Sequence, residues 1–323
     1  MNKRYTADLS LLFVAFIWGT TFVIVQRAIN ILPPHSFNTI RFFLASLILF
    51  LTIAVIDFKS LKNLNLKLIK SGFVLGIFLF AGYAFQTVGL LYTTASKAGF
   101  ITGLSVVLVP ILSVLVLKAY PKWTSLLSVL LAATGLYLLT MTGQSSFNYG
   151  DFLVFFCALF FALQIVFTGR YAPNYNSLIL AWVQITTVAI LSFIFAILFE
   201  DFYTINVTSL LTKDLIVALL ITSILATAFA FLAQTYFQRY TTPTRVAIIF
   251  AMEPVFAALT AYIILKEHLS YLSIIGGLLI FSGMIFAELN TRSFKSIFDS
   301  KKSELVQLKL NIEESDGDST PPD

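Results

Sequence analysis

The sequence predicts an all-α integral membrane protein with ten transmembrane helices in two inverted five-helix repeats. Three observations predict this fold: the composition, ten long apolar runs, and polar residues that recur at a constant spacing. Of 323 residues, 58% are apolar and 11% are charged, whereas soluble proteins carry about 25% charged residues. A water-soluble fold could not bury so much apolar surface. The composition therefore excludes a soluble enzyme, a nucleic-acid-binding protein and a disordered scaffold.

Ten apolar runs have the roughly 20 residues that a membrane-spanning helix needs. They fall near residues 8–27, 36–56, 71–92, 97–117, 123–142, 150–169, 178–199, 213–237, 244–265 and 271–289. The first run is longer than a signal-peptide core and lacks a cleavage pattern after it, so we predict a retained span. Pro110 and Pro254 fall inside spans and are expected to kink them. Cys157 is the only cysteine, which excludes an intramolecular disulfide.

The distribution of basic residues predicts the orientation of the chain. If the N-terminus is inside, 16 of the 21 Lys and Arg residues flank the spans on the inner side or lie in the tail, as the positive-inside rule requires. We therefore predict a multi-pass protein of the plasma (inner) membrane with both termini in the cytoplasm. Residues 291–323 change to mixed and then acidic composition, which predicts a disordered cytoplasmic tail.

Polar residues repeat along the chain without gaps. A shift of 148 residues places Gln86-Thr87 on Gln234-Thr235 and Lys97 on Arg245, and a shift of 143 places Asp8 on Asp151. These matches predict two related units, residues 1–143 and 149–290. Each unit holds five predicted spans, an odd number, so the second enters the membrane from the opposite side. Inverted repeats of this kind are typical of secondary transporters, in which they build one shared central site.

Several motifs resemble the EamA-type members of the drug/metabolite transporter superfamily. They are Trp18-Gly19-Thr20-Thr21-Phe22, Arg41-Phe42, Glu253-Pro254-Val255-Phe256-Ala257, Glu267-His268-Leu269 and the glycines Gly276 and Gly283. The resemblance covers roughly residues 8–288. It implies ten helices in two inverted repeats and the export or exchange of small metabolites, often amino acids. The chain departs from the family at Lys266-Glu267, where Gly-Glu is usual. The resemblance does not specify the substrate.

Polar and aromatic side chains at helical spacing are candidates for the substrate site. They are Trp18, Tyr83, Gln86, Gln164, Trp182, Gln184 and Gln234. Amide and hydroxyl groups with aromatic walls suit a polar solute. The alternative is that these residues make the interhelical hydrogen bonds that are ordinary in membrane proteins. Gln86 and Gln234 occupy repeat-related positions, which favours a shared site for this pair.

Charged residues within the spans complete the candidate site. Burying a charge in a membrane is costly, so a charged residue there is by default a candidate for a functional role. Glu253 is a candidate to bind a substrate amine or to carry a coupling proton, and the alternative is a structural ion pair. Arg41 is a candidate to bind a substrate carboxylate, and the alternative is that it snorkels to the surface. Lys97 and Arg245 begin two spans, where they either set topology or form paired gates.

The sequence contains no enzymatic or cofactor-binding signature. His35 and His268 lack metal-ligand spacing with Cys157, and no phosphate-binding loop or nucleophile elbow occurs. We predict a secondary transporter, not an enzyme, that needs no cofactor or metal. Its partners are a small-molecule substrate, the lipid bilayer and a candidate coupling proton. Efflux of amphipathic cations or drugs is the alternative, and a membrane-integral enzyme or sensor comes third. Transport direction and oligomeric state have no signal in the sequence.

Overall fold

Helices dominate the computed structural model, which describes residues 3–140, 148–200, 212–260, 262–263 and 270–287, and these ranges contain no strand. The predicted tail and the Glu267-His268-Leu269 motif lie outside the described residues. The first part of the chain forms α1 (Lys3–Ile29), α2 (Pro34–Ile56), the 3₁₀ helix η1 (Phe58–Asn63), α3 (Leu66–Gly89), α4 (Ala95–Gly103), α5 (Ser105–Leu117) and α6 (Trp123–Thr140).

The second part is also helical and has more interruptions. It forms α7 (Tyr149–Tyr171), the 3₁₀ helix η2 (Ala172–Asn174), α8 (Ser177–Phe199), α10 (Lys213–Leu220), the π-helix η4 (Ile221–Phe229), α11 (Ala230–Gln238), α12 (Pro243–Phe250), α13 (Glu253–Thr260) and a last helix, Tyr271–Ala287. α10, η4 and α11 follow one another without a break and form one long rod.

Within the described residues, each predicted apolar run is mainly helical, but two of the runs are broken. Eight candidate spans are long and apolar enough to cross a membrane, while α6 and Tyr271–Ala287 are shorter apolar helices. The run near 97–117 is interrupted at Leu104, between α4 and α5. The run near 244–265 is interrupted at Ala251 and Met252, between α12 and α13. Pro254 lies in the first turn of α13, directly after this break, where proline is tolerated.

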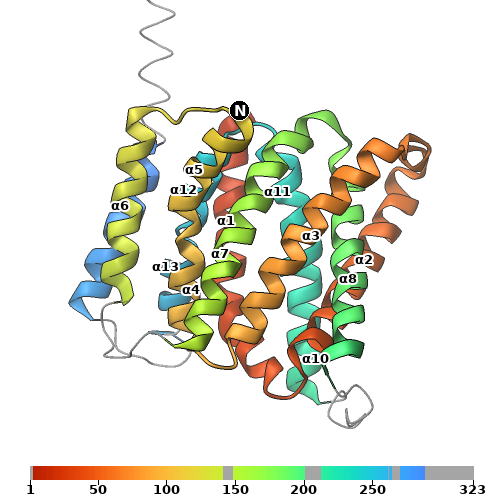
Figure 1. Ribbon diagram of the computed structural model, residues 1–323, viewed down its shortest axis with the longest axis horizontal. Helices are drawn as coiled ribbons and strands as arrows, with labels where there is room; N and C mark the ends of the chain where they lie inside the picture. Colours follow the sequence, from red (N-terminus) through yellow and green to blue (C-terminus); the bar gives the residue numbers. More distant parts are fainter. Residues whose placement is uncertain (1–2, 141–147, 201–211, 261, 264–269, 288–323) are drawn as a thin grey trace, which may run out of the picture.

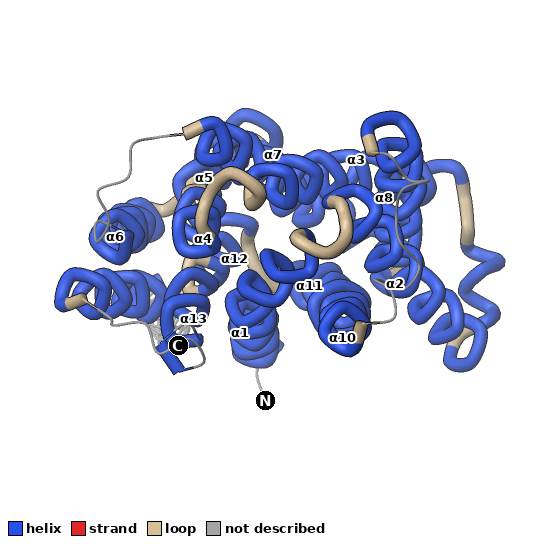
Figure 2. The backbone as a smooth tube through the Cα atoms, turned by 90° about the horizontal axis from the view of Figure 1, so that it is seen from below, coloured by secondary structure: helices blue, strands red, loops and turns tan. Residues whose placement is uncertain are grey.

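The two parts of the chain interleave instead of packing as separate units. α3 packs along α7 and α8, whereas α1 packs along α11, α12 and α13, and α2 lies against α8. Figures 1 and 2 place α6 at one edge of the bundle and α2 with α8 toward the other edge. α1, α7, α11 and α12 occupy the middle. The central helices are therefore neighbours of helices that are distant in the sequence.

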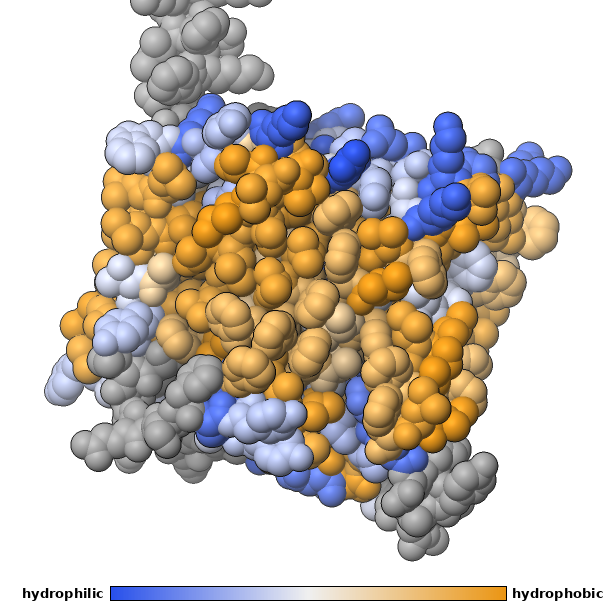
Figure 3. All heavy atoms as spheres, in the orientation of Figure 1, coloured by the Kyte–Doolittle hydropathy of each residue, from blue (hydrophilic) through white to orange (hydrophobic). Residues whose placement is uncertain are grey.

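The outer surface suits a lipid environment. Figure 3 shows a broad apolar band across the middle of one face, with hydrophilic residues gathered along the upper and lower edges. Large apolar side chains such as Phe43, Val55 and Leu115 are 61%, 84% and 72% exposed. In water such a surface would aggregate, but in a bilayer it faces acyl chains of the same polarity.

Glycines allow the central helices to approach closely. A Cβ atom on Gly19 would lie 2.4 Å from the backbone oxygen of Glu253, so α1 and α13 cross at this glycine. At the edge, a Cβ on Gly135 would lie 2.5 Å from the oxygen of Gly276, and one on Gly283 would lie 2.8 Å from the oxygen of Ser128. Gly99 differs, because its Cβ would meet no atom within 4 Å.

Gly19→Ala should destabilise the protein because the added methyl group forces α13, and Glu253 with it, away from α1. Overpacking of this kind costs about 1–3 kcal/mol. Gly99→Ala is the matched control, since its methyl group enters open space and alanine favours helix. Thermal unfolding of the purified protein in detergent should show a lower Tm for Gly19→Ala only. Equal Tm values for the two variants would contradict the close crossing of α1 and α13.

Candidate functional site

A cavity of about 60 Å³ lies midway along α1 and is the candidate substrate site. It offers room for a few water molecules, each of which needs about 10–15 Å³. α1, α2, α3, α4, α5, α7, α11, α12 and α13 all contribute to its wall. Both breaks in the helices lie beside the cavity: Gly103 and Ser105 flank the first, and Phe250 and Glu253 flank the second. Helix ends therefore meet the cavity from two sides.

Seven of the nine predicted site residues line this cavity. They are Trp18, Arg41, Tyr83, Gln86, Gln164, Gln234 and Glu253. Gln184 lies behind the wall, where its Oε1 accepts a 3.3 Å hydrogen bond from Gln164 Nε2. Trp182 does not line the cavity; its ring packs on Phe50 of α2, with 5.7 Å between the centroids. The two repeat-related glutamines, Gln86 and Gln234, thus come to one cavity, and only Trp182 is remote from it.

Arg41 points into the bundle and is 2% exposed, so it does not snorkel to the surface. Its Nε donates a 2.8 Å hydrogen bond to Thr227 Oγ1, and its Nη2 donates a 3.3 Å bond to the Tyr83 hydroxyl. The guanidinium also lies over the Tyr83 ring, 4.7 Å from the centroid. No carboxylate of the described residues pairs with Arg41. The side chain is held in place by neutral groups, and its charge remains available to a ligand.

Glu253 brings the opposite charge to the same cavity. It is the first residue of α13, directly after the break that follows α12. Its carboxylate has neither a hydrogen-bond donor nor a cation beside it within the described ranges, so the expected alternative of a structural ion pair is not seen there. A carboxylate at a helix N-terminus gains from the helix dipole. That gain helps it to remain in the bundle without a cation.

The π-helix η4 holds two of the cavity side chains. Trp18 Nε1 donates a 2.8 Å hydrogen bond to the oxygen of Ala226. The hydroxyl of Thr227, which accepts from Arg41, itself donates to the oxygen of Thr222, five residues earlier. A π-helix is rare and frequently occurs at functional sites. Here its widened turn offers a carbonyl and a hydroxyl that orient Trp18 and Arg41.

A chain of glutamines extends from the cavity between α7, α8 and α11. Gln234 Nε2 donates to Gln164 Oε1 at 3.1 Å and to Gln238 Oε1 at 3.3 Å. Gln238 Nε2 donates to the oxygen of Ile165. The interhelical bonding expected as the alternative is therefore present together with cavity exposure. Gln234 does both: it joins α11 to α7 and contributes to the wall.

Several cavity residues carry no distinctive sequence signal. Phe161 and Phe231 form apolar walls, but the chain contains 33 phenylalanines and neither of these two stands out. Thr102 and Ser105 are more accessible to sequence reasoning, because they are hydroxyl residues within an apolar run. Thr102 Oγ1 accepts a 3.4 Å hydrogen bond from Gln86 Nε2. The polar wall residues, with Trp18 and Tyr83, were predictable by residue type and spacing, whereas Phe161 and Phe231 were not.

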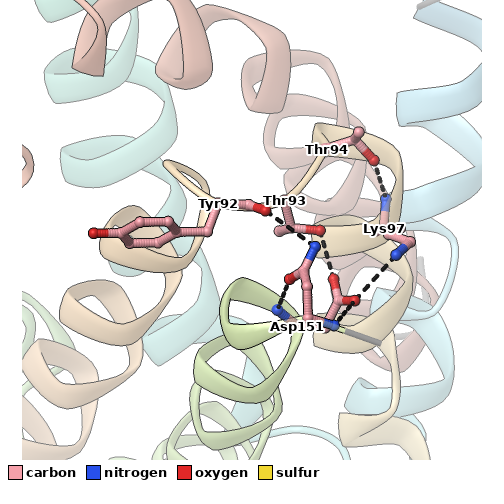
Figure 4. A network of polar contacts seen from close by, with 6 residues as sticks. Tyr92, Thr93, Thr94, Lys97 and Asp151 are labelled. Atoms are coloured by element: carbon pink, nitrogen blue, oxygen red, sulfur yellow. Dashed lines mark hydrogen bonds and ion pairs between the residues drawn. The ribbon is translucent and has the colours of Figure 1, made fainter. Parts of the chain in front are cut away.

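The basic residues that begin two spans are paired with acids. Lys97 Nζ lies 3.0 Å from Asp151 Oδ2, and Thr93 Oγ1 donates a 2.5 Å hydrogen bond to the other oxygen of Asp151; Figure 4 shows this network. Arg245 binds Asp8 through two bonds, Nε–Oδ1 at 2.9 Å and Nη2–Oδ2 at 2.6 Å. Lys97 and Arg245 lie near the N-termini of α4 and α12, where the helix dipole disfavours a cation, and the paired acid offsets this unfavourable interaction.

The chain matches known transporters over nearly its whole length. The sequence pattern of the EamA-like transporter family matches residues 5–141 and again residues 148–289. A protein of Archaeoglobus fulgidus named "Uncharacterized transporter" is 42% identical over 287 residues, which cover 89% of this chain and 87% of that protein. "Uncharacterized transporter YetK" of Bacillus subtilis (strain 168) is 24% identical over 290 residues, which cover 85% of this chain and 84% of that protein.

A solved crystal structure shares the fold, with a TM-score of 0.74 and 18% sequence identity over 90% of this chain and 99% of the other. The family pattern accounts for most of the chain in two segments, 5–141 and 148–289, which we call the N-terminal and C-terminal segments. The cavity lies between helices from both segments. Together, the matches show that this chain is a multi-pass membrane protein that belongs to the EamA-like transporter family.

Proposed function

We propose that the protein is a secondary transporter that exports or exchanges small polar metabolites, such as amino acids, across the plasma membrane by alternating access. One observation carries this proposal: Arg41 and Glu253 line the same cavity and neither is paired with an opposite charge among the described residues. A zwitterion presents a carboxylate to the first and an amine to the second. Gln86, Gln164 and Gln234 add neutral hydrogen-bonding groups between them.

Efflux of amphipathic cations is the second candidate function, and Glu253 with the aromatic walls favours it. The position of Arg41 argues against it, because a fixed guanidinium in so small a cavity repels a bound cation. A membrane-integral enzyme or sensor is the third candidate, and the cavity offers it no nucleophile paired with a base. Within the described ranges, no cluster of His, Cys, Asp or Glu is placed to hold a metal ion.

We further propose ten spans in two inverted repeats, residues 1–143 and 149–290, with α6 and Tyr271–Ala287 as the fifth and tenth. Three features support this proposal. The breaks at Leu104 and Met252 lie 148 residues apart, as do Lys97 and Arg245. α6 and the last helix make repeat-related contacts, since Gly135 lies against Gly276 and Gly283 lies against Ser128. Gly135 and Gly283 are 148 residues apart, and so are Ser128 and Gly276. The family pattern also matches twice. The distribution of basic residues supports cytoplasmic termini as part of the same proposal.

Transport assays in membrane vesicles of both orientations test the proposed function directly. Labelled amino acids and cationic dyes are loaded or offered in turn, with vesicles that lack the protein as the control. We expect saturable movement of at least one zwitterionic solute, and faster movement when unlabelled solute is present on the other side. Movement of cationic dyes alone would favour the second candidate function and contradict the amino acid site.

Gln86→Ala should weaken binding of the transported substrate without loss of folding, because it removes one neutral hydrogen bond to the substrate and leaves α3 intact. A bond of this kind contributes about 0.5–1.5 kcal/mol, so we expect KM to rise by roughly twofold to tenfold. Ile77→Ala, on the exposed face of the same helix, is the control and should leave KM unchanged. An unchanged KM in Gln86→Ala would remove this residue from the site.

Glu253→Gln separates proton coupling from substrate binding, because it keeps the shape of the side chain and abolishes its titration. If Glu253 carries the coupling proton, the variant still exchanges substrate, with a raised KM because the amide offers the amine no charge, but it no longer accumulates substrate in response to a pH gradient. Since no cation is paired with this residue, the variant should also reach the membrane in normal amount. Accumulation driven by pH that equals that of the unmodified protein would exclude Glu253 from coupling.

A further inference from the structure

The two ion pairs Lys97–Asp151 and Arg245–Asp8 correspond to each other under the repeat. The cations lie 148 residues apart and the acids lie 143 residues apart. Both cations follow a threonine cap: Thr94 Oγ1 accepts from the Lys97 backbone N–H, and Thr242 Oγ1 accepts from that of Arg245. In each pair the cation comes from one segment and the acid from the other. The pairs therefore join the two segments in the same manner.

The pairs lie at opposite ends of the bundle. Asp8 is near the start of α1, whereas Gln26, near its end, donates a 3.3 Å hydrogen bond to the oxygen of Thr93 in the Lys97 network. Eighteen helical residues separate these two points, which is about 27 Å. Trp18 and Thr21, which line the cavity, lie between them. In Figure 1, α4 is accordingly near one face and the start of α12 near the other.

A short helix connects each ion pair with the cavity. α4 runs from Lys97 to Thr102 and Gly103 in the cavity wall and ends at the break at Leu104. α12 runs from Arg245 to Phe250 in the wall and ends at the break at Ala251. A break in a helix lets the two halves move separately, because no continuous ladder of hydrogen bonds joins them. Each short helix can therefore turn about its break when its ion pair opens.

We propose that the two ion pairs are gates of the transport cycle, formed by Lys97 with Asp151 and by Arg245 with Asp8. This proposal rests on the alternating access proposed above. The Arg245–Asp8 pair closes the cavity toward the face that carries the N-terminus, and the Lys97–Asp151 pair closes it toward the opposite face. Both are formed in this structure. Opening one pair removes the charged link of α12 or α4 to the other segment, while the second pair keeps the far side shut.

The surroundings of the pairs support this role. Arg245 and Asp8 side chains are 6% and 10% exposed, and Asp151 is 2% exposed, so each pair seals against solvent. Lys97 is 23% exposed and thus lies at the rim. Ion pairs suit a gate because they have two stable states, paired when dry and separately hydrated when open. The backbones of α3 and α7 also approach each other closely beside Asp151, at Gly89 and Gly150.

Accessibility of a cavity cysteine tests the gates without any substrate. The probe is Thr21→Cys in a Cys157→Ala background, labelled with a membrane-impermeant maleimide in intact cells and in inside-out vesicles. We expect Lys97→Gln and Asp151→Asn to favour opening toward the face opposite the N-terminus. Labelling from that face should rise by roughly tenfold, equivalent to about 1.4 kcal/mol, and labelling from the N-terminal face should fall. Arg245→Gln and Asp8→Asn should produce the reverse pattern.

Controls separate gating from general loosening of the structure. Lys70→Gln removes an exposed cation outside both pairs and should change neither rate. If a neutralised variant does not reach the membrane, the charge-exchanged pair Lys97→Asp with Asp151→Lys replaces it and should restore labelling from both faces. Equal changes in the labelling rates from both faces in all four variants would contradict the gating role of the ion pairs. The proposed transport function would not be affected by that result. Labelling from one face only in every variant, the parent included, would instead overturn alternating access itself.

Discussion

Charge inside an apolar slab is stable only when the protein supplies its partner, and in this bundle each segment supplies the partner for the other. Among the described residues, Asp8 and Asp151 each form an ion pair only with a cation of the other segment, Arg245 and Lys97 respectively. A carboxylate that lost its partner and stayed buried without water would be strongly destabilising. The two segments therefore depend on each other, and α1 and α7 take their places against α12 and α4.

The cavity is the exception to this rule. Arg41 and Glu253 share the wall without contacting an acid or a base of the described residues. Neutral groups orient Arg41: a hydroxyl of the π-helix, the phenol of Tyr83 and the face of its ring. Leaving charges unpaired in a membrane is costly, and a site that binds a charged solute is a physical reason for that cost. The ion pairs at the ends and the unpaired charges at the centre thus divide the polar residues into two roles.

Close backbone contacts make this division possible. Gly19 allows Glu253 to lie against α1, and Gly76 brings α3 to within contact of Thr187 on α8. The motif residues Trp18-Gly19 and Glu253-Pro254 are therefore one structural unit, in which a glycine on one helix accommodates the first turn of another. The tryptophan beside that glycine reaches across to the carbonyl of Ala226. A motif that is split across the sequence becomes a single contact at the cavity wall.

The sequence by itself determined the helical class and the place of the apolar runs in the described residues, and seven of the nine site residues that it predicted line the cavity. These features follow from composition, run length and polar residues in apolar surroundings, which are local properties. Only the tertiary structure decided that Trp182 packs on Phe50, that Gly99 faces open space, and that Leu104 and Met252 interrupt their helices. Nor could periodicity show that Lys97 and Arg245 meet Asp151 and Asp8. Those outcomes depend on contacts between residues up to 237 positions apart, and which side chains meet at such a distance is set by how helices cross, not by the local pattern of any one of them.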